Sequence, residues 1–219
     1  MGVLEAVAHI VELGASPGAR ATVDGLRATF EARTGAFSAD DAWFEERIRA
    51  FWADAVTAGH LGQAVAPDLA ESERALLPAL HRAHRGLFRV ERDTLVDAWS
   101  GAELIASVLD DGSRAELDAS SGQLFDARVV ARADPFEVVL LPGAVFHPRD
   151  ATPCIDPVLA AARERKMSTT ETLDALLRMN RALRSLSRVK VAYAYRPEAL
   201  SPAAPAIPHP VRRSPKGPK

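Results

Sequence analysis

The sequence contains a single cysteine, Cys154, among 219 residues. One cysteine cannot form a disulfide within the chain, and a lone thiol is more typical of a reducing compartment than of a secreted protein. No window approaches eighteen uncharged apolar residues, so the sequence predicts no membrane-spanning helix. The first fourteen residues lack a basic start and a small-residue cleavage pattern, and they predict an amphipathic helix instead of a signal peptide. These features predict a cytoplasmic protein.

The glycine patterns of nucleotide-binding loops are also missing. The glycines within 12–20 and 140–144 do not have the Gly-x-x-x-x-Gly-Lys or Gly-x-Gly-x-x-Gly spacing that places backbone amides around a phosphate. The stretch DASSGQL, at 118–124, has serine and glycine but is predicted to lie between strands, whereas a nucleophilic serine needs a strand-to-helix turn. The sequence therefore predicts no cofactor and no catalytic residue.

Residues 144–156, AVFHPRDATPCID, concentrate residue types that carry chemistry: His147, Asp150, Cys154 and Asp156. A nucleophilic cysteine needs an adjacent base, and a structural zinc site needs more sulfur and nitrogen ligands than this stretch offers. A helix that begins at Asp156, with Pro157 in its first position, explains the same residues. A start at Thr152 would place Pro157 inside the helix. We interpret the stretch as a strand-to-helix junction without a metal.

Two histidines near the end of the predicted N-terminal helices are a further candidate. His81 and His84 lie three residues apart, a spacing that can direct two imidazoles at one metal. The neighbouring residues add only arginines, which repel a cation. We interpret the two histidines as part of a half-buried seam that leads into the first strand, with no metal.

The composition, 47% hydrophobic and 26% charged, is that of a globular protein. Helical periodicity predicts helices at 17–34, at 38–59 with Ser38 as its cap, and at 68–85, kinked or restarted at Pro78. Short apolar runs separated by turn residues then predict six strands. These runs are 86–92, 94–100, 102–109, 122–132, 136–141 and 144–148.

Alternation within the fourth run predicts a strand with one solvent-exposed face, which carries Asp126 and Arg128. After the strands, helical periodicity returns at 155–166 and 168–195. The sequence thus predicts an α+β fold in four regions. These are a helical bundle at 1–85, a small antiparallel sheet or half-barrel at 86–150, two C-terminal helices at 151–196, and a Pro-rich, basic, disordered tail at 197–219.

The net charge of −2 conceals an uneven distribution. Residues 163–219 contain thirteen Lys and Arg against four Asp and Glu, whereas residues 1–162 contain fourteen against twenty-five. The body is therefore about −11 and the C-terminal quarter about +9. Such separation is typical either of a basic tail for an acidic partner or of two parts of one protein that attract each other.

The predicted helix 168–195 has arginines along one side and apolar residues along the other. The candidate anion- or partner-binding residues are these arginines and the basic residues of the tail: Arg178, Arg181, Arg184, Arg188, Arg212, Arg213 and Lys216. Arginine suits phosphate and carboxylate groups because its planar guanidinium donates parallel hydrogen bonds. A solvated helix face, or a face paired with the acidic body, explains the same pattern and stays open.

Four stretches of the middle region carry a resemblance: HRGLFRV at 84–90, LVDAWSGAEL at 95–104, GQLFDARVV at 122–130 and LLPGAVFHP at 140–148. They resemble a β-rich module of uncharacterised bacterial proteins, some of which carry an appended SEC-C zinc motif. That motif is missing here, because one cysteine cannot supply it. The resemblance implies a small barrel-like module and lends no catalytic residue.

We expect a non-enzymatic interaction or regulatory protein. Its predicted partner is another protein or a second copy of the chain, or else a nucleic-acid backbone contacted through the basic C-terminus, and no membrane. One alternative is a structural homo-oligomer. Another is an enzyme whose site assembles at the mouth of the small barrel from distant residues: His84, Asp97, Glu103 and His147.

Overall fold

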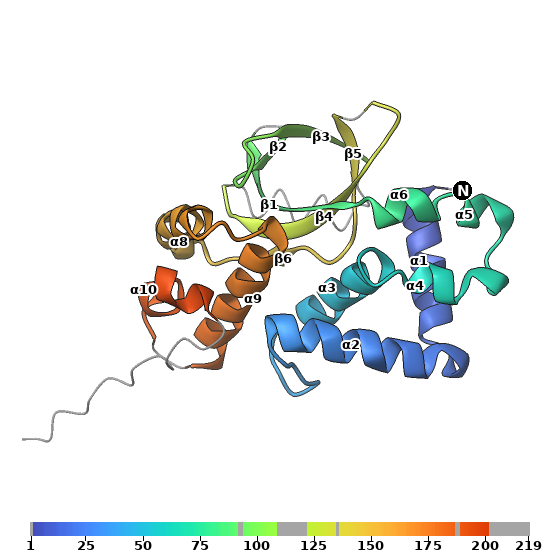
Figure 1. Cartoon of the computed structure of the whole chain (residues 1–219), viewed down its shortest axis with the longest axis horizontal. Helices are drawn as coiled ribbons and strands as arrows, with labels where there is room; N and C mark the ends of the chain where they lie inside the picture. Colours follow the sequence, from blue (N-terminus) through green and yellow to red (C-terminus); the bar gives the residue numbers. More distant parts are fainter. Residues whose placement is uncertain (1, 92–93, 109–121, 135, 187–188, 202–219) are drawn as a thin grey trace, which may run out of the picture.

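The fold is α+β, as the sequence predicts. The computed structural model describes residues 2–91, 94–108, 122–134, 136–186 and 189–201. Figure 1 shows a barrel with the N-terminal helices on one side and the C-terminal helices on the other. In the part of the chain that is described, no helix is both long and apolar enough to cross a bilayer.

The N-terminal region consists of six helices and two 3₁₀ turns. They are α1 (Val3–Gly14), η1 (Pro17–Ala19), α2 (Arg20–Thr34), α3 (Phe44–Val56), α4 (Leu61–Ala64), η2 (Ala66–Asp68), α5 (Glu71–Arg74) and α6 (Leu77–His81). Their apolar sides form a core around Phe30 and Phe51, whose rings lie edge to face. The predicted restart at Pro78 is confirmed.

The predicted start of the helix at Ser38 is wrong. The helix α3 begins at Phe44, and the residues before it form a turn. The backbone N–H of Ser38 donates to the carboxylate of Asp41 at 2.8 Å. This local hydrogen bond offers the backbone an alternative to helical pairing, as short polar side chains commonly do.

Six strands follow in the described part of the middle region, at the predicted places. They are β1 (His84–Glu91), β2 (Thr94–Asp97), β3 (Glu103–Val108), β4 (Phe125–Ala131), β5 (Glu137–Leu140) and β6 (Val145–Phe146). The strand order is β1-β2-β3-β5-β4, and β4 pairs back with β1, so the predicted half-barrel closes. All pairs are antiparallel except β3 with β5.

The long strand β1 closes the barrel because it pairs with two neighbours. Its second half lies against β2, and its first half lies against β4. Gly86 lies opposite Ala127 within this first half, and a Cβ at Gly86 would come within 2.6 Å of the Phe88 ring. A glycine is therefore needed for the close packing at this point.

The interior of the barrel is filled with apolar side chains. Its core consists of Phe88, Leu95, Phe125, Ala127, Val129, Val138 and Leu140. Residues of the opposite parity on β1 and β4 point out of the barrel, toward the helices. This outer face includes the two charged residues of β4, Asp126 and Arg128, both of which are buried. The prediction that this face is exposed to solvent is therefore wrong.

Over residues 149–186 and 189–201, the C-terminal region has three helices and two 3₁₀ turns. They are η3 (Arg149–Ala151), α8 (Thr152–Glu164), α9 (Thr169–Ser185), α10 (Val191–Ala194) and η4 (Pro197–Leu200). Ser168 caps α9, and Glu171 completes the capping box, as its sequence predicts. Leu87, Leu124 and the apolar sides of α8 and α9 share one core.

Three details of this region differ from the sequence-based expectation. The helix α8 begins at Thr152, not at Asp156, and carries Pro157 inside it. Pro157 is exposed and has no backbone N–H, so the helix lacks one hydrogen bond at this point. The helix α9 ends at Ser185, well before residue 195. The predicted tail begins later than 197, because Leu200 is buried at 1% exposure. Residues 202–219 lie outside the described residues.

Candidate functional site

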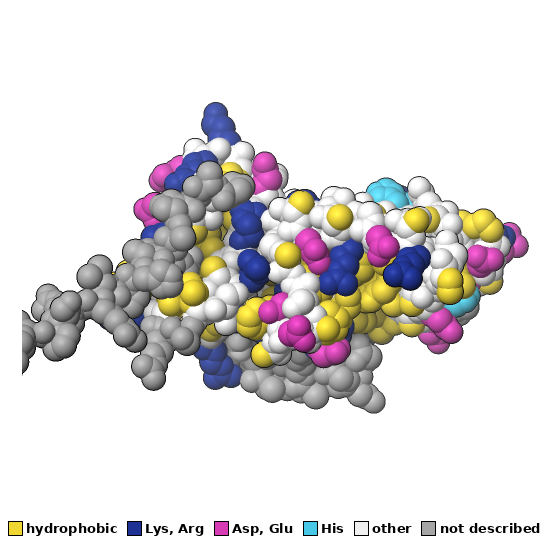
Figure 2. Space-filling view, turned by 90° about the horizontal axis from the view of Figure 1, so that it is seen from below, with side chains coloured by type: hydrophobic (Ala, Val, Ile, Leu, Met, Phe, Trp, Pro, Cys, Tyr) yellow, Lys and Arg dark blue, Asp and Glu magenta, His cyan; other side chains and the backbone are white. Residues whose placement is uncertain are grey.

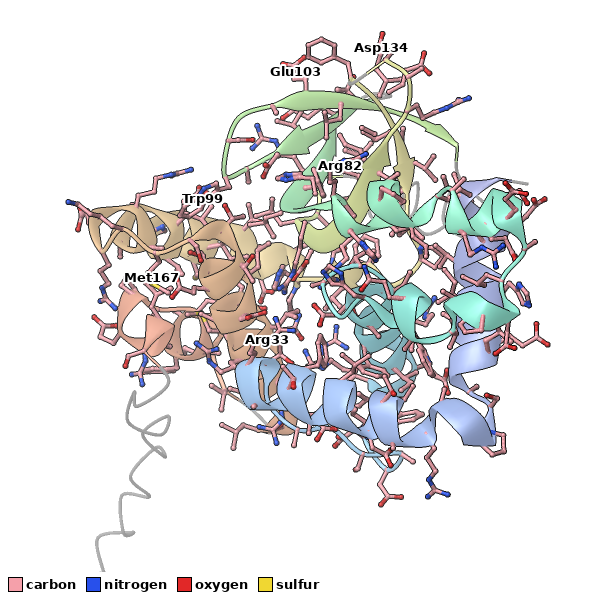
Figure 3. The ribbon with its side chains drawn as sticks, turned by 45° about the vertical axis from the view of Figure 1, so that its right-hand side comes forward. Arg33, Arg82, Trp99, Glu103, Asp134 and Met167 are labelled. Carbon is pink, nitrogen blue, oxygen red and sulfur yellow. The ribbon has the colours of Figure 1, made fainter. Side chains whose placement is uncertain are left out.

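The three regions meet at a buried cluster of arginine and aspartate side chains, which we call the junction network. Its members are Arg33 of α2, Asp54 of α3, Arg85 of β1, Asp126 and Arg128 of β4, and Asp174 of α9. Each of the three arginines pairs with at least one of the three aspartates. Figure 3 shows Arg33 at the end of α2 that faces α9.

Arg85 is the central member. Its Nε and Nη2 donate to the two carboxylate oxygens of Asp126, at 3.0 and 2.7 Å, in a bidentate pair. Its Nη1 donates to Asp174 at 2.7 Å. Burial alone would lower the pKa of the Arg85 guanidinium, but the two carboxylates outweigh this effect and raise it. Arg85 is therefore a permanent cation.

Arg33 and Arg128 complete the junction network from its two sides. Arg33 donates to Asp54 at 2.6 Å and to Asp174 at 3.1 Å, and Arg128 donates to the other oxygen of Asp54. Burial, and then the charge of Arg85, lower the pKa of Arg128 to about 10, against the opposing effect of Asp54. This pKa still leaves Arg128 charged at neutral pH.

The junction network opens into a cavity of about 290 Å³, which we call the junction pocket. All three arginines and Asp54 of the junction network reach its wall, and the remaining lining comes from the ends of α3 and α6, from His84, and from Thr169 and Thr170. The two threonines form the first turn of the 17-residue helix α9. The first backbone N–H groups of a helix have no partner within the helix and carry its positive dipole end, so this wall suits an anion.

His84 stands on the wall of the junction pocket with a buried carboxylate behind it. Its Nε2 lies 3.2 Å from Oδ2 of Asp97, which is fully buried, while the His84 side chain is half exposed. The Ser100 hydroxyl and the Trp99 backbone N–H also donate to Asp97, at 2.7 and 2.9 Å. Burial alone would raise the pKa of Asp97, but these hydrogen bonds outweigh it and hold the pKa below its usual value.

Two of the four residues considered for a barrel-mouth enzyme therefore come together. Glu103 is exposed and pairs with Val96 across β2 and β3. The side chains of Val96 and Asp97 point to opposite faces of β2, so Glu103 and Asp97 lie on opposite faces of the sheet. Figure 3 places Glu103 at the far side of the barrel from Arg33. His147 is fully buried elsewhere, with Nδ1 at 2.7 Å from the Tyr195 hydroxyl.

The predicted stripe of arginines on α9 makes contacts within the chain. Arg178 donates to the backbone oxygens of Arg33 and Leu200, at 2.5 and 3.2 Å, and Arg184 pairs with Glu46 of α3 at 2.5 Å. Arg181 packs against Gly35. Figure 2 shows basic and acidic side chains interspersed on the face seen from below. The other predicted basic residues, Arg188, Arg212, Arg213 and Lys216, lie outside the described residues.

The stretch 144–156 does not form a reactive cluster. His147 hydrogen-bonds to Tyr195, and burial, which disfavours the charged imidazole, lowers its pKa to about 4. Cys154 is a half-buried free cysteine on α8 that packs against the C-terminal core. The described structure shows no hydrogen bond between the two side chains.

His81 and His84, considered above as a pair of metal ligands, lie in different surroundings. His81 ends α6 and stacks on His60, with ring centroids 4.0 Å apart, whereas His84 begins β1. Burial, and then the neighbouring His60, lower the pKa of His81. Within the described ranges, no group of three or more histidine, cysteine or acidic side chains is arranged to hold a metal ion.

Sequence reasoning did not single out any member of the junction network as a site residue. The signal was present in the parity of the strands: Arg85, Asp126 and Arg128 all point to one face of the sheet. Both signs of charge on one strand face, opposite an apolar face, are consistent with a buried ionic layer. The same pattern is equally consistent with a solvent-exposed face. Only the helices that cover this face in the folded protein distinguish a buried ionic layer from an exposed surface.

Comparisons with known proteins identify no relative. No protein-family model, no curated protein and no solved structure matches this chain. The resemblance of residues 84–148 to a β-rich bacterial module therefore stays a prediction.

Proposed function

We propose that this protein is an interaction or regulatory protein that binds a small acidic group in the junction pocket. One observation carries the proposal: three arginines and the first turn of α9 converge on the wall of a single cavity. Guanidinium groups and helix N-terminal amides both donate hydrogen bonds to phosphate and carboxylate oxygens. The acidic group belongs to a small molecule or to a side chain of a partner.

Charge balance favours a singly charged group over a doubly charged one. The three arginines of the junction network are neutralised by its three aspartates. The remaining attraction comes from the dipole end of α9, which amounts to about half an elementary charge. A second negative charge on the ligand would therefore face little compensation in a partly buried site.

The basic residues of the C-terminus stay a second, predicted contact. Arg178 and Arg184 already bind groups of the chain itself, so this prediction now concerns the other basic residues named for it: Arg181, Arg188, Arg212, Arg213 and Lys216. A nucleic-acid backbone bound there would release counterions, so binding would fall steeply as salt is added. Absence of binding to DNA and RNA at low salt would contradict it.

The experiment for the junction pocket is an NMR titration at low ionic strength. Dimethyl phosphate carries one charge and methyl phosphate carries two near neutral pH. We expect saturable shifts of the Thr169 and Thr170 amides with dimethyl phosphate and weaker binding of methyl phosphate. Replacing Thr170 by glutamate puts a negative charge on the pocket wall but leaves the junction network intact, and it should weaken binding at least tenfold.

The matched control is Thr22→Glu, which places the same charge in the first turn of α2, where Thr22 is exposed. Both substitutions put an acidic residue at a helix N-terminus, where it is tolerated well. Thr22→Glu should leave the titration unchanged. Equal weakening in both variants, or shifts that never saturate in the original protein, would contradict the proposal.

A further inference from the structure

The wall of the junction pocket holds a base as well as donors. Asp97 is fully buried, and its carboxylate accepts hydrogen bonds from three groups. They are the His84 ring, the Ser100 hydroxyl and the Trp99 backbone N–H. An ionised carboxylate accepts hydrogen bonds only, so the Nε2 of His84 carries the proton in this contact. The Nδ1 of the neutral imidazole is then the atom left with a free lone pair.

The position of the imidazole is fixed by its surroundings. The His84 ring meets the Phe88 ring edge to face, with centroids 6.0 Å apart. Gly86 lies between them, and a Cβ there would approach Nε2 of His84 to 3.1 Å. Because the ring is held by a buried carboxylate and an aromatic neighbour, His84 is oriented as a general base is in enzymes.

We infer that His84 acts as the general base that cleaves a phosphodiester in the junction pocket, with a hydroxyl of the ligand itself as the nucleophile. This inference rests on the proposed binding of a singly charged group, because a phosphodiester carries one negative charge at neutral pH. Asp97 is a positioning residue, since it acts through His84.

The reaction is complete without a further reactant. His84 Nδ1 takes the proton of the ligand's hydroxyl, whose oxygen bonds to phosphorus as the bond from phosphorus to the leaving oxygen breaks. The products are a cyclic phosphodiester and an alcohol or phenolate, and His84 returns its proton to the leaving oxygen or to water. Arginine and α9 donors stabilise the charge that gathers on the phosphoryl oxygens.

The choice of an internal hydroxyl follows from the need for a nucleophile. Among the three threonines of the pocket wall, Thr57 donates its hydroxyl to the Ala53 carbonyl at 2.6 Å. Thr169 and Thr170, in the first turn of α9, are assigned to binding of the phosphate. A hydroxyl held next to the phosphorus within one molecule has an effective concentration of about 10⁵ M or more. One general base and a set of hydrogen-bond donors for the phosphoryl oxygens are therefore sufficient for this reaction.

The test uses 2-hydroxypropyl 4-nitrophenyl phosphate, a small diester with a neighbouring hydroxyl, and follows the release of 4-nitrophenolate by the full-length protein. His84→Gln should lower kcat at least a hundredfold and leave binding of dimethyl phosphate unchanged. His9→Gln, on α1 and away from the pocket, is the matched control and should keep the original rate.

Asp97→Asn tests the positioning role. An asparagine NH₂ that donates to Nε2 forces the proton onto Nδ1, so kcat should fall at least tenfold while KM and the binding of dimethyl phosphate stay the same. A loss of both kcat and binding would instead indicate a purely structural Asp97 and would overturn its assigned role.

The outcomes separate the two proposals. If dimethyl phosphate binds but the hydroxypropyl diester is cleaved no faster than in buffer, the catalytic inference is wrong and the binding function stands. Equal rates in the original protein and in His84→Gln would also overturn the inference. If neither compound binds, the proposed binding function fails together with it.

Discussion

Asp174 links two arginines of the junction network, since its carboxylate accepts from both Arg33 and Arg85. Desolvation of buried ions costs several kcal/mol for each ion, so such a network stabilises the fold only while every charge is paired. The pairing here is nearly complete, with two of the three aspartates bridging two arginines each. The loss of one aspartate would therefore leave the network with one uncompensated, buried positive charge.

We predict that Asp174→Ala lowers the free energy of unfolding by about 3–5 kcal/mol. Urea denaturation followed by circular dichroism measures the change. The control is Asp24→Ala, which removes a carboxylate from the exposed Arg20 pair and should leave the stability almost unchanged. A small effect of Asp174→Ala, similar to that of the control, would show that water reaches the network.

His147 makes the stability depend on acid. Its folded pKa of about 4 lies below the ordinary histidine value of about 6.5, because the imidazole is buried. Between these values the unfolded chain binds the proton and the folded chain does not, so stability is lost as the pH falls through this window. We predict a loss of roughly 3 kcal/mol from this residue between pH 7 and pH 4.

The measurement is the unfolding free energy of the original protein and of His147→Gln across this pH range. Other groups contribute equally to both proteins, so the difference between them isolates the histidine. We expect the advantage of the original protein to shrink as the pH decreases. A difference that is constant with pH would contradict the prediction.

At the scale of elements, the C-terminus of α2 is stabilised by arginines of two neighbouring helices, one of them from α9. The last carbonyls of a helix have no partner within it and carry its negative dipole end. Arg178 binds the oxygen of Arg33, and Arg47 of α3 binds those of Thr34 and Gly35. Gly35 has φ = +91°, which a glycine adopts without strain and which turns the chain out of the helix.

We predict that Arg178→Ala lowers the free energy of unfolding by about 2 kcal/mol, because two carbonyls lose a charged donor. Arg165→Ala is the control, since Arg165 is exposed at the end of α8. Chemical denaturation of both variants measures the effect. Equal stability of the two would indicate that water replaces Arg178 without cost.

The sequence predicts the elements of this fold much better than their boundaries. The strands are predictable because turn residues separate runs with a period of two, and α9 is predictable because Ser168 and Glu171 form a capping box. The start of α8 is not, because Pro157 lies in its second turn, where it removes one hydrogen bond, and the burial of Ile155 and Val158 from the same turns favours the helix. The parallel pair of β3 and β5 is not predictable from local sequence at all, since it depends on how the barrel closes.

The candidate site is less predictable than the fold. Alternation along β4 correctly places Asp126 and Arg128 on one face, but the local sequence does not say that α3 and α9 cover it. The arginines of α9 are correctly noted as a group, and yet Arg178 and Arg184 turn toward the N-terminal helices. His84 and Asp97 meet only because β1 and β2 pair in a particular register, which places Asp97 opposite Phe88.

At the scale of the whole molecule, the junction network and the apolar cores both join the three parts. One core lies inside the barrel, one is centred on the N-terminal helices and includes Val130 and Val139 of the barrel, and one is centred on the C-terminal helices and includes Leu87 of the barrel. The ion pairs cross all three boundaries: Arg33 to Asp174, Arg85 to Asp174 and Arg128 to Asp54. Unfolding of any one part would leave buried charges in the other two parts without their partners, so we expect the three parts to unfold together.

We predict a single unfolding transition, which the three tryptophans can report separately. Trp43, just before α3, and Trp52, within it, belong to the N-terminal region, and Trp99 follows β2 beside Arg163 of α8. In a Trp99→Phe variant and in a Trp43→Phe, Trp52→Phe variant, fluorescence and circular dichroism should give the same urea midpoint. Adding Asp174→Ala should lower both midpoints together, whereas a fluorescence midpoint that departs from circular dichroism in either variant would show that the parts unfold independently.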